Sequence, residues 1–214
     1  MDIPLFTEYG LNYLFRWGHM SFGVVWIGLL YYFNFVQTEY FKESEASAKS
    51  DVVQKLVPNA LWYFRWAAAF TFLTGLYLLY WLSITVNIGI VLGAVMGTIM
   101  AANVWFVIWP NQKKVIAGAP DAADAGAKAG LASRTNTLFS LPMLYLMVYS
   151  AHGGSLPMIA ESSMNSLWLG LAIILLIEAN ALFGKMNAMI TSVKAVIHSG
   201  VALTVIFGLL VHYL

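Results

Sequence analysis

Four histidines are the side chains of this sequence best suited to chemistry, and all of them lie within apolar segments or at their ends: His19, His152, His198 and His212. Ionisable side chains inside a bilayer are costly, and they usually face a bundle interior, a water-filled cavity or a cofactor. The chain has no cysteine, which excludes disulfides, iron–sulfur clusters and thiolate metal sites. Imidazole is a common axial ligand of b-type haem, which fits between the helices of a bundle. We therefore expect haem b as the cofactor, with histidines as its ligands.

Helix geometry limits which histidines can share one haem. With a rise of about 1.5 Å per residue, His19 lies about 12 Å below the start of its apolar segment at Leu11. His152 and His212 lie at the ends of their segments on the same side, whereas His198 is about 21 Å deeper than His212. We expect a haem near this side, held by His19 with His152 or His212, and we take His19 and His152 as the first choice of iron ligands. A pairing of His19 with His198 would need helix tilt and stays open.

Two residues flank His19 on the same face of its helix, Arg16 one turn earlier and Trp26 two turns later. The Arg16 guanidinium is a candidate partner for a haem propionate, and Trp26 is a candidate wall of the cofactor site. Arg16 could instead extend to the membrane surface. His152 and His212 could likewise lie among lipid headgroups without binding a cofactor.

One carboxyl group, that of Glu178, lies well inside an apolar segment. A carboxylate in this position has to be neutral, paired or hydrated. Lys185 and Lys194 lie towards the same side, so an ion pair with one of them and a proton-transfer role are both open.

The elements that carry these residues are apolar enough to reside in lipid. The sequence has 214 residues, of which 60% are hydrophobic and 10% charged, with a mean hydropathy of +0.75. A water-soluble domain of this size could not cover so apolar a surface. A spanning helix needs about 20 mostly apolar residues. Six segments qualify: Leu11–Val36, Asn59–Ser83, Ile88–Trp109, Thr135–His152, Ser166–Phe183 and Val193–Tyr213. We predict an all-α fold, a polytopic transmembrane bundle that forms a single domain over residues 1–214.

The basic residues predict the orientation of this bundle. Of the 11 lysines and arginines, all but Arg16 and Arg65 lie in or beside three of the five connections. These connections join the first segment to the second, the third to the fourth and the fifth to the sixth, and they include residues 118–130, which we interpret as a small polar loop. By the positive-inside rule they face the cytoplasm, so both termini face the outer, periplasmic side of a bacterial inner membrane. The formal net charge of +1 gives no reason to expect nucleic acid as a partner.

The first segment and the stretch from Asn103 to His152 carry a resemblance to a known family. The first contains Arg16-Trp17-Gly18-His19-Met20, and the second contains Trp109-Pro110-Asn111-Gln112-Lys113, Arg134-Thr135-Asn136-Thr137 and Ser150-Ala151-His152. These motifs resemble the membrane domain of the bacterial cytochrome c-linked urate oxidase (urate hydroxylase) family. His19 and His152 match histidines of that family. The sequence has no Cys-x-x-Cys-His, so we expect the family's C-terminal cytochrome c domain to be lacking here.

The resemblance implies a redox scaffold that passes electrons between the periplasmic side and a quinone or a partner protein, such as a c-type cytochrome. We expect the chain to form a homo-oligomer or to be a subunit of a complex. Whether it catalyses a reaction is open, and oxidoreductase is the class to test. Two alternatives remain. One is a cofactor-free accessory subunit that packs against a larger complex through the small-residue stripe Gly93, Gly97 and Ala101; the other is a urate- or porphyrin-oxidising enzyme.

Overall fold

The computed structural model is all-helical in the residues that it describes, which are 4–82, 86–153 and 164–213. Within them, six long helical stretches follow one another. They are Glu8–Glu43, α4 (Val57–Leu82), Ile88–Ile116, α7 (Ala122–His152), α8 (Met164–Phe183) and α9 (Val193–Tyr213). Two shorter helices are η1 (Pro4–Phe6) and α3 (Ala46–Lys55). Every predicted segment falls on one of the long stretches, with Ser83 outside the described residues. The all-helical fold class is confirmed.

Two of the long stretches contain a π-helical segment, which the sequence analysis did not predict. The first consists of α1 (Glu8–Tyr31), η2 (Tyr32–Gln37) and α2 (Thr38–Glu43). The third consists of α5 (Ile88–Ala102), η4 (Asn103–Ile108) and α6 (Trp109–Ile116). Both π segments contain a buried asparagine, Asn34 in η2 and Asn103 in η4. A π segment leaves backbone groups without their regular partners, and polar side chains nearby can satisfy them.

The prediction of a polar loop over residues 118–130 is wrong, because α7 already begins at Ala122. Alanine has the highest helix propensity, and this stretch is alanine-rich. Ala125 and Ala129 are buried, and α6 packs against α7 along this turn. Lys114 Nζ donates to Asp121 Oδ2 at 2.6 Å across the short connection, and this bond holds the pKa of Asp121 below its usual value. The connection between the first and second long stretches also contains the helix α3 (Ala46–Lys55).

Four of the helical stretches are long and apolar enough to cross a membrane: Glu8–Glu43, Ile88–Ile116, Met164–Phe183 and Val193–Tyr213. The other two long helices are less apolar for visible reasons. Helix α4 carries Arg65 among many tyrosines and tryptophans, and α7 carries the polar run Arg134-Thr135-Asn136-Thr137.

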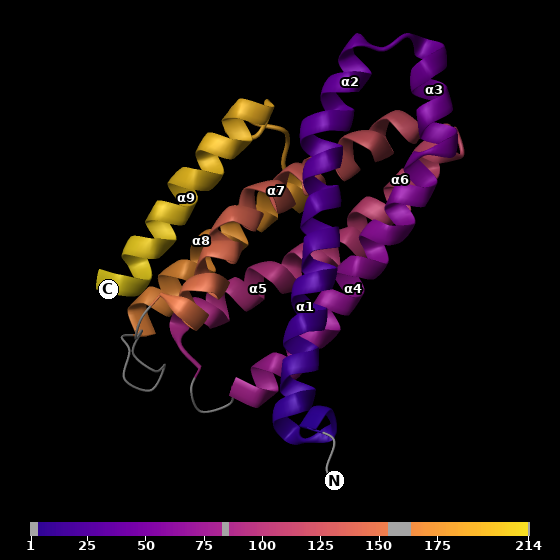
Figure 1. Ribbon diagram of the computed structural model, residues 1–214. Coiled ribbons are helices and arrows are strands. Elements are labelled where there is room, and N and C mark those ends of the chain that lie inside the picture. The colour runs from indigo at the N-terminus through magenta and orange to yellow at the C-terminus, as the bar shows by residue number, and fades with distance from the viewer. Residues whose placement is uncertain (1–3, 83–85, 154–163, 214) are drawn as a thin grey trace.

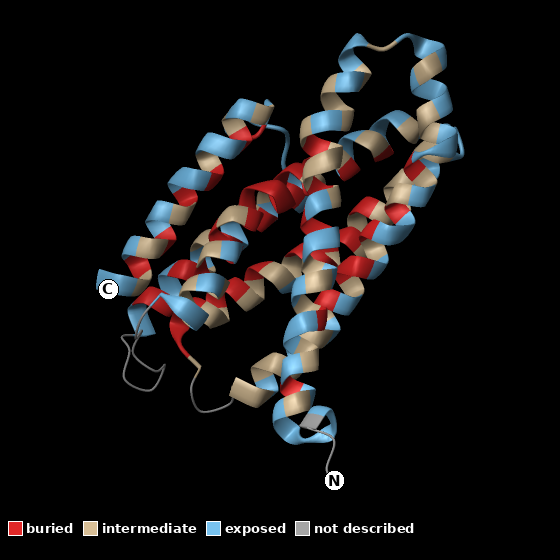
Figure 2. Cartoon of the chain, viewed as in Figure 1, coloured by how far each residue is buried: buried red, intermediate tan, exposed pale blue. Residues whose placement is uncertain are grey.

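Helix α7 is the central element of the bundle. All seven residues from Arg134 to Ser140 are buried, so this part of the helix is covered on every side. Its main neighbours are α5, α6 and α9, while α1 packs chiefly against α4. Figure 2 shows the buried residues gathered on α7 and on the inner faces of the helices around it.

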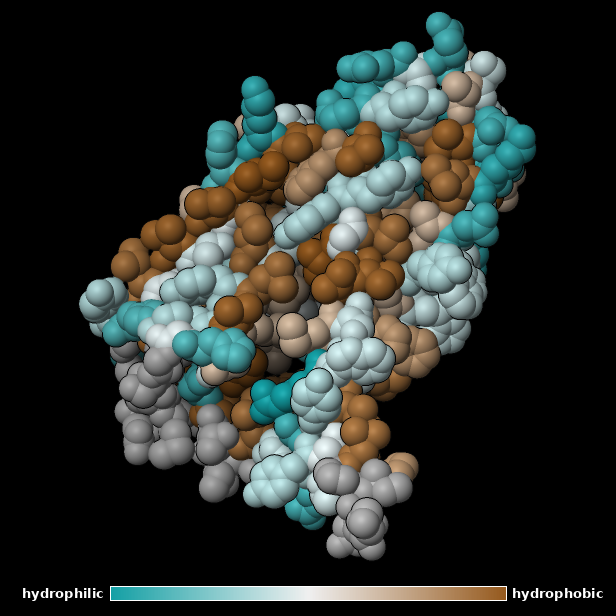
Figure 3. All heavy atoms as spheres, viewed as in Figure 1, coloured by the Kyte–Doolittle hydropathy of each residue, from teal (hydrophilic) through white to brown (hydrophobic). Residues whose placement is uncertain are grey.

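Successive long helices run in opposite directions, so their connections lie at two opposite ends of the molecule. In Figure 1, the start of α1 and the end of α9 point towards the lower part of the view, whereas α2 and α3 and the start of α9 lie at the upper part. Figure 3 shows hydrophilic side chains over α2 and α3 and a hydrophobic band over α9 and the middle of this face.

The small-residue stripe of α5 is used inside this chain. A Cβ built on Gly93 would lie 3.3 Å from Met147 Cγ and 3.5 Å from the Met143 carbonyl oxygen, and one built on Gly97 would lie 3.5 Å from Met147 Cε. These close approaches are to α7. Gly93 and Gly97 are therefore packed against a helix of the same chain.

Candidate functional site

His19 lies at the interface of α1 and α4, with one ring nitrogen anchored. His19 Nδ1 lies 2.9 Å from the Thr71 carbonyl oxygen and 3.2 Å from Thr74 Oγ1. A carbonyl oxygen can only accept, so Nδ1 carries the hydrogen and donates it to Thr71. The neutral imidazole then has its lone pair on Nε2. A backbone carbonyl on Nδ1 is a usual way in which proteins orient a metal-binding histidine.

Small residues make room for this imidazole between the two helices. A Cβ built on Gly75 of α4 would lie 3.1 Å from His19 Cε1 and 3.4 Å from Nδ1. One built on Gly18 would lie 3.8 Å from Thr74 Cγ2. The absence of a side chain at Gly75 therefore allows the ring to lie against the α4 backbone.

Aromatic pairs close the interface on both sides of His19. The rings of Phe15 and Tyr77 stack with centroids 3.8 Å apart, and those of Phe22 and Phe70 stack at 5.0 Å. Phe15 and Phe22 come from α1 and their partners from α4, four residues before and three residues after His19. These pairs hold the register of α1 against α4, and so hold His19 opposite Gly75.

Arg16 and Trp26 take different environments on either side of His19. Arg16 is exposed, and its Nε donates to Asn12 Oδ1 at 2.7 Å. Trp26 is only 2% exposed, and its Nε1 is buried without a hydrogen-bond partner. Arg16 is thus exposed near the start of α1 with its Nε bonded to Asn12, and Trp26 presents an unused donor inside the bundle.

His152 and His212 lie at the ends of α7 and α9, and each of them is near Tyr149. The rings of His212 and Tyr149 meet edge to face at 4.6 Å. His212 Nδ1 donates to the Gly208 carbonyl at 2.6 Å, within its own helix. His152 and Tyr149 line one shallow hollow, together with Tyr145. The expectation that His152 and His212 lie at the same end agrees with this arrangement.

The contacts of His19 belong to a different part of the bundle. They go to α4, whereas those of His152 and His212 go to α7, and Figure 1 shows the ends of α7 and α9 to the left of α1. His198 is exposed on α9, one turn after Lys194. Among residues 4–82, 86–153 and 164–213, no group of three or more His, Cys, Asp or Glu side chains is close enough to hold a metal ion.

A polar cluster at the centre of the bundle is the main feature that the sequence analysis did not assemble. Asn103 Nδ2 donates to Asn136 Oδ1 and to Glu178 Oε2, each at 3.0 Å. Asn136 Nδ2 donates to the Met100 carbonyl at 2.9 Å. The three side chains come from η4, α7 and α8 and are 2%, 0% and 9% exposed. Glu178 is hydrogen-bonded to a neutral amide here, so the ion pair with Lys185 or Lys194 is not what the structure has.

Two further polar contacts tie the first helical stretch to α7. Asn34 Nδ2 donates to Ser133 Oγ at 2.8 Å, and the hydroxyls of Tyr31 and Ser140 are 2.9 Å apart. The single polar residues in these apolar segments were a signal of such contacts, because a buried polar group needs a partner. Their partners could not be read from the sequence, since they are about 100 residues away.

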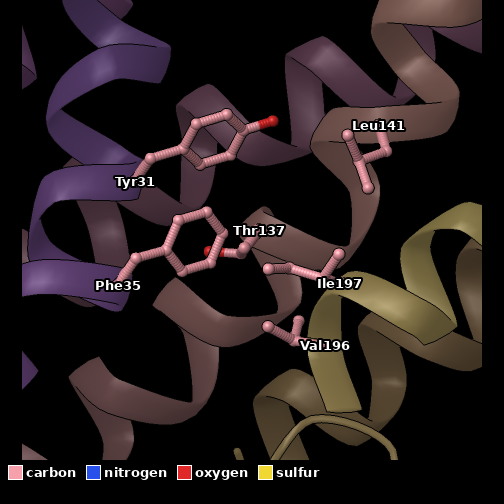
Figure 4. A pocket seen from close by; sticks show the side chains of 6 residues that line it. All are labelled: Tyr31, Phe35, Thr137, Leu141, Val196 and Ile197. Atoms are coloured by element: carbon pink, nitrogen blue, oxygen red, sulfur yellow. The ribbon is translucent and has the colours of Figure 1, made fainter. Parts of the chain in front are cut away.

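An apolar crevice lies beside these contacts. It has a volume of about 180 Å³ and is lined by Tyr31, Phe35, Thr137, Leu141, Val196 and Ile197. Figure 4 shows that α1 and η2 form one wall and α9 the opposite wall, with α7 contributing Thr137 and Leu141. The Tyr31 and Phe35 rings stack at 4.9 Å, which stiffens the first wall.

Comparison with known proteins gives one family. The model of the family described as "Urate oxidase N-terminal" matches residues 85–211, which is more than half of the chain and includes α5, α7, α8 and most of α9. The polar cluster, His152 and His198 lie inside the match, and His19 lies before it. No curated protein and no solved structure matches the chain. The chain belongs to the urate oxidase N-terminal family.

Proposed function

We propose that this chain is a membrane-embedded haem b protein that transfers electrons between the periplasmic side and a quinone or a partner protein. The observation that carries the proposal is the anchored imidazole of His19, whose Nδ1 donates to the Thr71 carbonyl and whose Nε2 is left with a lone pair. This imidazole would be able to bind haem iron through Nε2. When bound, the haem would supply one-electron transfer.

The residues of this chain would hold the group in stated ways. His19 would bind the haem iron from α1, and His152, whose contacts lie in a different part of the bundle, would be the first choice among the other imidazoles, with His198 and His212 as the alternatives. Arg16, exposed one turn before His19, would pair with a propionate. The unpartnered Trp26 Nε1 offers a hydrogen-bond donor on the buried side. The apolar crevice beside Tyr31 is suited to a quinone ring, because it is small, apolar and open.

The topology that goes with this function has six spanning helices and both termini on the periplasmic side of a bacterial inner membrane. Four stretches qualify by length and apolar composition. The proposal that α4 and α7 also span the membrane is supported by their lengths of 26 and 31 residues and by their packing alongside the other four helical stretches. The basic residues at the α2–α3, α6–α7 and α8–α9 ends support the orientation.

An absorption spectrum tests the haem proposal. We expect the protein purified in mild detergent to show a Soret band and a dithionite-reduced minus oxidised difference spectrum typical of b-type haem. His19→Ala should abolish both, and His152→Ala should abolish them or shift the band because an axial ligand is lost. Met20→Ala, at an exposed position next to His19, is the matched control and should leave the spectrum unchanged. A wild-type protein without a Soret band after haem supplementation would refute the proposal.

The family match supports a second candidate, participation in urate oxidation. An assay of urate consumption by the purified protein, with an added electron acceptor, distinguishes these two candidate functions. Haem absorbance without urate consumption supports electron transfer as the function. Urate consumption by a protein without haem supports the second candidate.

A further inference from the structure

The carboxyl group of Glu178 lies in the bundle without an ion pair to any lysine, arginine or histidine in the part of the chain that the structure describes. Glu178 is 9% exposed, and its Oε2 accepts a hydrogen bond from the amide of Asn103. Glu178 lies five residues before the end of α8 at Phe183, about 7.5 Å along the helix axis. It is therefore inside the bundle and separated from the α8–α9 connection by more than one turn.

The elements packed against Glu178 bring few charges towards it. Helix α5 and segment η4 contain no ionisable residue. On α7, Arg134 precedes Asn136 by two positions and so points to a different face of the helix. On α9, the nearest basic side chains along the helix, Lys194 and His198, are exposed. The ion pairs among the described residues join Lys42 to Glu39, Lys55 to Asp51 and Lys114 to Asp121, all outside this region.

The amides of Asn103 and Asn136 suit a neutral Glu178 carboxyl better than an ionised one. Asn103 Nδ2 has two hydrogens, and both are used, one by Asn136 Oδ1 and one by Glu178 Oε2. Asn136 in turn donates to the Met100 carbonyl, at the place where the helix changes from α to π pairing. One neutral donor does not offset the cost of burying an ionised carboxylate in a membrane bundle. A protonated carboxyl carries no charge to desolvate, and its carbonyl oxygen can accept the bond that Asn103 Nδ2 donates.

We propose that Glu178, with Asn103 and Asn136, forms a proton-binding site at the centre of the bundle. The ligand is a proton from water, which binds at Oε1 while Oε2 keeps its bond from Asn103. Release returns the same proton to water and leaves a carboxylate, so the step changes the charge of the bundle interior by one. The site is independent of the haem proposal, because the hydrogen bonds of Asn103, Asn136 and Glu178 described above involve no histidine.

Infrared spectroscopy of the reconstituted protein tests this site. At neutral pH we expect the C=O stretching band of a protonated carboxyl, which shifts in D₂O and gives way to carboxylate bands when the proton is released. Glu178→Gln should remove the band, since its side-chain amide can still accept from Asn103 but cannot titrate. The matched control is Glu43→Gln at an exposed position, which should leave the band in place.

A second variant guards against a misfolded Glu178→Gln protein. Asn103→Ala removes the donor to Oε2, and we expect the carboxyl band to move to higher frequency. A wild-type spectrum without a protonated carboxyl band at neutral pH would overturn the proposal. So would a band that neither variant changes, because it would belong to another group.

Discussion

At the scale of single residues, the position of the His19 ring depends on a missing side chain. Gly75 has no Cβ, and one added there would lie 3.1 Å from His19 Cε1, closer than most real contacts of this kind. Because His19 Nδ1 is bonded to the α4 backbone on the same side, the ring has little freedom to move away without losing that bond.

We therefore expect Gly75→Ala to displace the imidazole and weaken haem retention by about 1–3 kcal/mol, the usual cost of overpacking. Haem content per protein, measured by absorbance after purification, checks this. Gly28→Ala on α1 is the control, since nothing lies within 4 Å of its added Cβ. It should retain haem and favour the helix by about 1 kcal/mol. Equal haem loss in both variants would show that the loss does not arise at the His19 ring.

At the scale of elements, α7 binds the bundle together because helices on several sides approach it closely. Helix α5 does so through Gly93, and α9 through Gly200, where an added Cβ would lie 2.8 Å from Leu141 Cδ1. In a bilayer, close packing and hydrogen bonds drive helix association, since lipid is as apolar as the side chains that it replaces. Small residues at these helix crossings therefore contribute more to helix association than the apolar residues around them.

Gly93→Leu should push α5 away from α7 and destabilise the folded protein by about 1–3 kcal/mol or more. The measurement is the midpoint of thermal unfolding in detergent. The corresponding change at Gly130, whose added Cβ would meet nothing within 4 Å, is the control and should leave the midpoint nearly unchanged. If both variants unfold alike, the close approach of α5 to α7 contributes little to stability.

At the scale of the whole molecule, the lysines gather at one end (Figure 1) and apolar surface lies along the middle (Figure 3). The basic residues of α2, α3, α6 and the α8–α9 connection lie at the end opposite the start of α1. This polarity is what the positive-inside rule uses, and it supports the proposed orientation.

Single cysteines test that orientation directly, because the natural sequence has none. Lys49→Cys and Lys114→Cys should react with a membrane-impermeant maleimide only after the inner membrane is opened. Tyr9→Cys and Tyr213→Cys should react in intact spheroplasts, since both tyrosines are exposed and at the other end. Labelling of Lys49→Cys and Lys114→Cys from outside would reverse the proposed topology.

The sequence by itself determined the helical class and where each long helix lies, because a run of about 20 apolar residues has few other ways to satisfy its backbone in lipid. The start of α7 was missed, since its alanine-rich turn lacks the apolar signal of a spanning segment and becomes helical by propensity and by packing on α6. The grouping of the histidines could be predicted only by depth along each helix. Which histidines meet also depends on how each helix is rotated about its axis and on which helices lie beside it.

Only the tertiary structure decided which polar groups meet. It joined His19 to Thr71, and Asn103 to Asn136 and Glu178, across as many as 75 residues of sequence. The physical reason is that a hydrogen bond between helices depends on how each helix is rotated against its neighbour, and that rotation follows from close packing at glycines such as Gly75 and Gly93. No periodicity within one helix contains this information.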